Sequence, residues 1–155
     1  MTSVDFAQDS IIPAQQASLL SMRHVTAKNR ASWLELFAED AVVQDPVGFS
    51  PLDPSGLGHC GKDAIGRFWD KVIANQKGFY TIRESYPCAN ECANVLTVTQ
   101  MLPNGRHLDI SFVVVYRVNE AGRIISLKAY WQYDKMMQDY ASAMVDYSRQ
   151  IRPGS

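Results

Sequence analysis

Apolar side chains recur at helical spacing in some stretches of the chain and alternate with polar ones in others. The clearest helical pattern lies between Gly61 and Gly78, where apolar positions fall at i, i+3, i+4, i+7 and i+8, the stripe of an amphipathic helix. Pro13 suits the first turn of an earlier helix, and a short apolar group around Trp33 predicts another. The stripe of the clearest helix consists of Ile65, Phe68, Trp69, Val72 and Ile73.

The second half of the chain has the patterns of strands, with Asn104-Gly105 as a strong hairpin signal. Alternation places Phe112, Val114 and Tyr116 on one apolar face, which must meet the helices. Helices followed by antiparallel strands predict an α+β domain with its helices on one sheet face. Strands are expected at residues 41–45, 79–86, 94–102, 106–118 and 123–133, and an additional helix at 135–152.

Composition narrows the class of protein. A length of 155 residues predicts one domain, with a flexible segment at residues 1–12 and a C-terminal helical extension at 135–152. A net charge of −1 gives no basic surface for nucleic acid, and no apolar run approaches the roughly 18 residues that cross a membrane. The N-terminus lacks a signal-peptide core, and three cysteines are an odd count that indicates reduced thiols. We therefore expect a cytoplasmic protein without a metal or other cofactor.

Asp45 is the most informative single residue. It lies two residues after Val43 at the end of a short strand pattern, so both side chains should point to the same face. Pro46 stops the strand, and the Pro- and Gly-rich stretch at residues 48–58 predicts a loop that forms a pocket rim or lid. A carboxylate at the rim of an apolar cavity is typical of proton-transferring enzymes, whereas an Asp-Pro pair also occurs as a simple turn cap. The local pattern leaves both interpretations open.

Three segments resemble the bacterial Δ5-3-ketosteroid isomerases. They are residues 36–48, 61–69 and 117–131, in the order of that family. The wider group is the nuclear-transport-factor-2-like (SnoaL-like) superfamily, which also contains polyketide cyclases and dehydratases. The resemblance implies a cone-shaped α+β barrel, in which a curved mixed or antiparallel sheet wraps around N-terminal helices. It does not settle the activity, since one fold serves many reactions.

The resemblance assigns roles to some residues and leaves others unfilled. It implies that Asp45 is the general base, and that Phe68, Leu127 and Trp131 form the pocket wall. The family holds the enolate oxygen with a tyrosine and a protonated aspartic acid, and Ser21 and Val114 occupy those positions here. Trp69 replaces a supporting tyrosine. The standard oxyanion hole is therefore absent. Tyr116 and His24 are candidates for substitute donors, and the remaining residues expected to contact the substrate are Ser21, Trp69, Phe112 and Val114.

Three functions follow as hypotheses. The first is an isomerase-like enzyme in which Asp45 moves a proton next to a carbonyl of a steroid-like or polycyclic substrate. The second is a non-catalytic protein that binds a hydrophobic small molecule, because Val114 makes the pocket more apolar. The third is a dehydratase or cyclase that uses His24 and Asp45. By analogy with relatives, we also expect a homodimer that forms through the outer face of the sheet.

Overall fold

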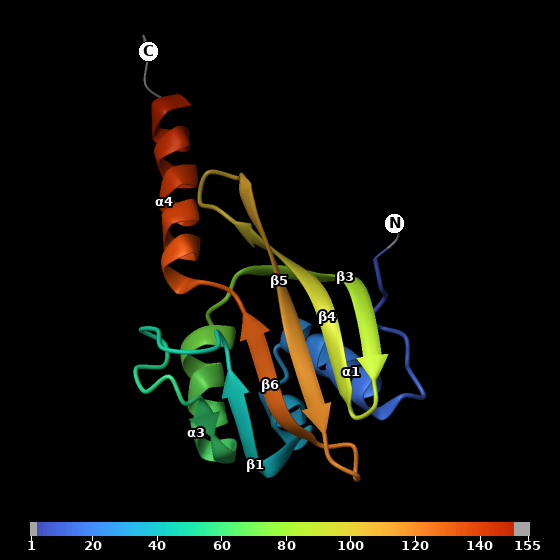
Figure 1. Cartoon of the computed structure of the whole chain (residues 1–155). Helices are drawn as coiled ribbons and strands as arrows, with labels where there is room; N and C mark the ends of the chain where they lie inside the picture. The colour runs from blue at the N-terminus through green and yellow to red at the C-terminus, as the bar shows by residue number, and fades with distance from the viewer. Residues whose placement is uncertain (1–2, 151–155) are drawn as a thin grey trace.

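The structure is a computed structural model that describes residues 3–150, with side chains described as far as Val145. Three helical segments precede or interrupt the early strands, and one helix follows the last strand (Figure 1). The predicted tail residues 151 and 152 lie outside the described part of the chain. The elements are α1 (Pro13–Thr26), α2 (Arg30–Glu35), β1 (Phe37–Gln44), β2 (His59–Cys60), α3 (Gly61–Phe68), the π-helical turn η1 (Trp69–Ile73), β3 (Gly78–Cys88), β4 (Glu91–Met101), β5 (His107–Val118), β6 (Ile124–Tyr130) and α4 (Tyr133–Gln150).

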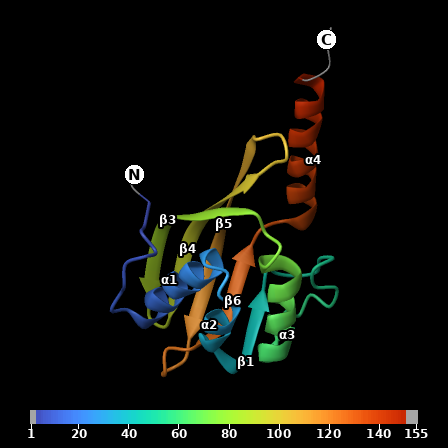
Figure 2. The same cartoon turned by 180° about the vertical axis from the view of Figure 1, so that it is seen from behind.

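The six strands form one curved sheet in the order β2-β1-β6-β5-β4-β3. Strand β1 pairs with β6 in parallel, and the other neighbours are antiparallel. Figure 2 shows α1, α2 and α3 together on one face of this sheet. The α+β class and the mixed sheet are confirmed. The curved sheet wraps around the helices as expected, and it is unclosed, with β2 and β3 as its two edges.

Long-range pairing moves two element boundaries away from the positions that local patterns predict. Strand β1 begins at Phe37 rather than at residue 41, since the Ile124 amide donates to the Leu36 carbonyl at 2.8 Å and captures this segment for the sheet. The helical region after Gly61 ends at Ile73, and Gly78 opens β3 instead of ending that helix. Both differences arise from contacts between segments far apart in sequence, which periodicity does not encode.

The two ends of the chain differ in how they meet the body. The segment expected to be flexible makes defined contacts: the Val4 amide donates to the Ile82 carbonyl at 2.7 Å, and the Arg23 guanidinium donates to the Phe6 carbonyl at 3.1 Å. Helix α4 instead projects beyond the sheet (Figures 1 and 2), with its first turn beside the concave side. No helix within the described residues is long and apolar enough to span a membrane.

Candidate active site

A cavity of about 350 Å³ lies between the helices and the concave face of the sheet. Helices α1, α2 and α3, η1, strands β1 and β3 to β6, and the start of α4 all contribute to its wall. Leu52, from the loop predicted as a rim or lid, also lines it. Most of the wall is apolar, and its principal side chains are Met22, Phe68, Leu96, Phe112, Val114 and Leu127. This chemistry favours an apolar ligand.

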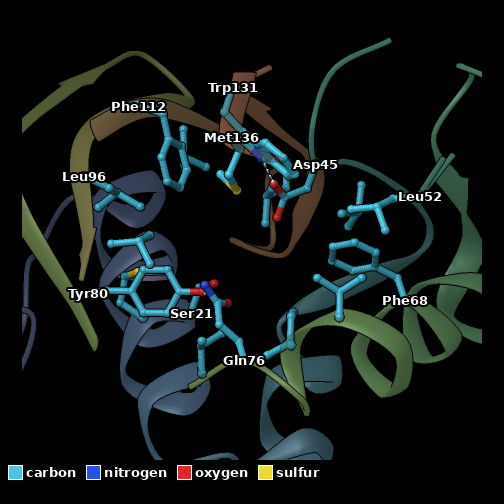
Figure 3. A pocket seen from close by; sticks show the side chains of 18 of the residues that line it. Ser21, Asp45, Leu52, Phe68, Gln76, Tyr80, Leu96, Phe112, Trp131 and Met136 are labelled. Atoms are coloured by element: carbon cyan, nitrogen blue, oxygen red, sulfur yellow. Dashed lines mark hydrogen bonds between the residues drawn. The ribbon is translucent and has the colours of Figure 1, made fainter. Parts of the chain in front are cut away.

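Asp45 brings a carboxylate to this apolar wall. Strand β1 points Val43 and Asp45 into the cavity, and the parallel pairing of Val43 with Leu127 fixes their register against β6. The Asp45–Pro46 peptide bond is cis. The Trp131 indole Nε1 donates a hydrogen bond to Asp45 Oδ1 at 2.5 Å (Figure 3). The carboxylate is thus held at the cavity by Trp131, which follows β6 at the same end of this parallel strand pair.

The environment of Asp45 makes its carboxylate more basic. Burial raises its pKa above the ordinary value of 3.8, and the hydrogen bond from Trp131 lowers it by a smaller amount. Among the described side chains, no Lys, Arg or His forms an ion pair with Asp45. A carboxylate without a cationic partner in an apolar cavity is suited to accept a proton, because protonation removes the cost of the buried charge.

Three buried side chains form a hydrogen-bonded trio on another part of the wall. Trp33 Nε1 and the Tyr116 hydroxyl each approach Ser21 Oγ at 3.0 Å. All three residues are 1% exposed and line the cavity. The trio holds three N–H or O–H hydrogens and makes two mutual bonds, so one hydroxyl proton is left over. Because Tyr116 donates to Ser21 Oγ, that proton belongs to Ser21, and the adjoining cavity is where a ligand oxygen would accept it.

A second polar pair lies beside the trio. The Tyr80 hydroxyl donates to the Gln76 side-chain oxygen. Figure 3 shows Tyr80, Gln76 and Ser21 converging on the side of the cavity opposite Asp45. Burial raises the pKa of Tyr80, and the negative charge of Asp45 raises it further. Burial and the Asp45 charge also raise the pKa of Tyr116. Both phenols therefore stay protonated and interact electrostatically with the Asp45 carboxylate across the cavity.

The structure places most of the predicted site residues on one cavity. Trp33 also lines it, although the sequence pattern indicates only a helix core position for this residue. Tyr80 and Gln76 have no part in the sequence-based site. Alternation along β3 from Gly78 offers a signal for Tyr80, but Gln76 follows the last helical turn, where spacing does not fix a side-chain direction. The predicted residues that line the cavity are Ser21, Asp45, Phe68, Phe112, Val114, Tyr116, Leu127 and Trp131.

Two predicted site residues lie elsewhere. His24 is half-buried and is not among the described residues that line the cavity, because the buried stripe of α1 passes through Ser18, Met22 and Val25 instead. Trp69 is buried but faces the helix layer, where its ring lies 5.1 Å from that of Trp33. The π-helical turn that starts at Trp69 alters the rotation of the following side chains. The structure therefore does not bring His24 or Trp69 to the cavity that Asp45 lines.

The remaining candidates for chemistry near the cavity are a metal site and His59. Within the described residues, His, Cys, Asp and Glu side chains form no group of three or more that could hold a metal ion. The His59 ring stacks on Phe68 with centroids 4.8 Å apart, behind the cavity wall. Burial lowers the pKa of His59, while nearby Asp53 opposes that shift. His59 thus supports the wall from the outside.

The sequence pattern of the SnoaL-like domain family matches residues 21–127. The chain belongs to the SnoaL-like family, whose fold is nuclear-transport-factor-2-like. The crystal structure of Rv0760c from Mycobacterium tuberculosis is 38% identical, with a TM-score of 0.74, and the match covers 82% of this chain and 96% of that one. A Δ5-3-ketosteroid isomerase from Mycobacterium sp. is 36% identical over 80% of this chain and 96% of its own, with a TM-score of 0.72.

A further solved structure shows a steroid ligand in a relative. It is Rv0760c in complex with estradiol-17beta-hemisuccinate, and it is 39% identical to this chain. The match covers 79% of this chain and 95% of that one, with a TM-score of 0.71. Solved relatives of this SnoaL-like protein thus include a ketosteroid isomerase and a protein with a bound steroid derivative.

Proposed function

We propose that this SnoaL-like protein is a ketosteroid isomerase-like enzyme in which Asp45 moves a proton next to a carbonyl of a hydrophobic substrate. The observation that carries the proposal is the position of the Asp45 carboxylate. It lies on an apolar cavity, held by Trp131, with hydroxyl groups of other elements on the opposite side (Figure 3).

The cavity suits a flat, largely apolar substrate. Its volume of about 350 Å³ is at the lower end of the roughly 300–1,000 Å³ typical of small-molecule sites. Phe68, Phe112 and Leu127 supply extended apolar contacts, and few polar groups remain to fix the orientation of a ligand. Relatives that act on or bind steroids support a steroid-like or polycyclic ketone as the substrate class.

The proposed reaction needs a base and a partner for the oxygen. Asp45 takes a proton from the carbon between the carbonyl and a β,γ double bond, and the electron pair of that C–H bond moves into the carbonyl to give a dienolate. The protonated Asp45 then returns the proton at the γ carbon, which leaves a conjugated ketone. The Ser21 hydroxyl, which accepts from Tyr116 and keeps its own proton, donates to the oxygen while it carries negative charge.

A second function rests on a specific observation. Ser21 and Val114 stand where the isomerases have their tyrosine and aspartic acid, and Val114 is an apolar part of the wall. A more apolar wall favours binding of a ligand over polarisation of its carbonyl. The alternative function is therefore a non-catalytic protein that binds steroid-like molecules. The dehydratase hypothesis loses its acid–base pair, because His24 does not line the cavity with Asp45.

We predict that the purified protein converts a β,γ-unsaturated ketosteroid such as 5-androstene-3,17-dione into the conjugated ketone faster than buffer alone. The reaction is followed by the absorbance of the product, and binding is measured in parallel by quenching of tryptophan fluorescence. Binding without conversion would select the non-catalytic alternative. Neither binding nor conversion would remove steroid-like ketones as the ligand class.

The homodimer stays a prediction. Val113 and Tyr130 pair across β5 and β6 and are 37% and 49% exposed. They therefore leave apolar surface on the outer face of the sheet, where we propose that a second copy binds.

A further inference from the structure

Gln76 presents hydrogen-bond donors to the cavity for which the described part of the chain provides no acceptor. Its side-chain oxygen accepts the Tyr80 hydroxyl proton. An amide nitrogen carries two N–H donors, and no acceptor for Gln76 Nε2 occurs among the described residues. Gln76 lines the cavity and is half-buried. A ligand oxygen in this part of the cavity would therefore find N–H donors on the wall.

The main chain at Gln76 is anchored by Lys28. The ammonium of Lys28 donates to the Ile73 carbonyl at 2.6 Å and to the Gln76 carbonyl at 3.1 Å. Lys28 itself follows α1 with a φ of 55°, a left-handed conformation that turns its side chain across to η1. The amide of Gln76 is therefore carried by a segment that is fixed to α1, the helix that also holds Ser21.

We propose that Gln76 Nε2 donates to the carbonyl oxygen that Asp45 activates, as the second oxyanion donor beside the Ser21–Tyr116 pair. This inference rests on the proposed function for the choice of ligand. Gln76 is the group that touches the substrate, and Tyr80 is a positioning residue that keeps the amide oxygen turned away. With its own oxygen occupied, the amide offers only donors, so it selects an apolar ligand that carries a carbonyl or enolate oxygen.

The Tyr80 phenol stays protonated, which supports this arrangement. Burial, the charge of Asp45 and the neighbouring Tyr116 all raise the pKa of Tyr80. The phenol thus keeps its proton over the working pH range and continues to donate to Gln76. A neutral amide held in one orientation costs less to reorganise than a freely rotating one when charge develops on the oxygen.

The test combines a change in the protein with a change in the ligand. The ligands are 4-androstene-3,17-dione and androst-4-en-17-one, which lacks the carbonyl oxygen at position 3. Because loss of Gln76 frees the Tyr80 hydroxyl to donate in its place, Tyr80→Phe is compared with Tyr80→Phe/Gln76→Met. We expect the added Gln76→Met change to weaken binding of the dione about tenfold and binding of the 17-ketone by less than about twofold. Gln138→Met on the exposed side of α4 is the control.

Infrared spectroscopy of the bound dione gives a readout that altered packing alone would not move. The stretch of the 3-carbonyl should shift to higher frequency in Tyr80→Phe/Gln76→Met, as a donor is lost, while the 17-carbonyl serves as an internal reference. Equal losses for both ligands, or a shift confined to the 17-carbonyl, would overturn the assignment of Gln76. Binding requires no turnover. If Gln76→Met weakens binding of the dione selectively but the protein does not isomerise ketosteroids, the proposed function is refuted and the Gln76 contact remains.

Discussion

Asp45→Asn is expected to lower kcat for ketosteroid isomerisation by roughly 10²–10⁴-fold, the usual contribution of a positioned general base. The amide has nearly the same shape, and its oxygen can still accept the Trp131 indole proton. Steroid affinity should therefore change by no more than about threefold. Stopped-assay or absorbance rates give kcat, and fluorescence quenching gives the affinity. An Asp45→Asn protein with the rate of the unaltered protein would eliminate Asp45 as the base.

The pH dependence follows from the raised pKa of Asp45. The base acts only when ionised, so kcat/KM should rise with pH through a midpoint above the ordinary value of 3.8 and then level.

The folded state also binds this proton more tightly than the unfolded state, so the stability that Asp45 contributes is complete below the unfolded pKa and is lost as pH rises through the folded pKa. Asp45→Asn should consequently be more stable than the unaltered protein at neutral pH, and the difference should vanish on acidification below about pH 4. Urea titrations at the two pH values measure this difference and establish that the variant folds.

Trp33→Ala is expected to reduce the free energy of unfolding by about 3–5 kcal/mol, the usual cost of removing a large buried aromatic ring. Trp33 is 1% exposed. Its ring lies 4.6 Å from that of Phe37 and 5.1 Å from that of Trp69, so its loss opens space between the helix layer and the cavity. Trp33→Phe should cost less, because Tyr116 remains to donate to Ser21 Oγ. Urea denaturation measures both values.

The matched control for this prediction is Phe49→Ala. Phe49 is an aromatic residue of the loop after β1 and is 79% exposed, so its removal should change stability by no more than about 0.5 kcal/mol. If Trp33→Ala costs no more than Phe49→Ala, then Trp33 does not support the cavity wall in the way the structure describes. A large cost for both would point to an unrecognised role for the loop.

The position of Asp45 could be predicted because it depends on local rules. Side chains two residues apart in a strand share a face, so an inward Val43 implied an inward Asp45. The same alternation in β5 placed Phe112, Val114 and Tyr116 together, and all three line the cavity. The class of fold was predictable for a similar reason, since helical and strand periods separate clearly along this chain.

The polar side opposite Asp45 could not be predicted in the same way. The direction of Gln76 depends on a π-helical turn that local apolar spacing does not distinguish from an ordinary helix, and on the anchor that Lys28 provides from the end of α1. Helical spacing did not separate His24 from the residues of α1 that line the cavity, because the apolar face of a helix is broad and includes positions at its flank. The open sheet edge at β2 also escaped prediction, because two residues carry too little pattern.

Hydrogen exchange at the γ carbon of the conjugated ketone tests the central claim most directly. The protein is incubated in D₂O with 4-androstene-3,17-dione, and mass spectrometry follows deuterium entering at C6, the γ carbon from which the reverse of the proposed reaction removes a proton. If the Asp45 carboxylate moves the proton between C4 and C6 through a dienolate, the unaltered protein should catalyse the exchange at C6 and Asp45→Asn should be slower by roughly 10²-fold or more. Exchange at the same rate in both proteins, or no faster than in buffer, would contradict the account.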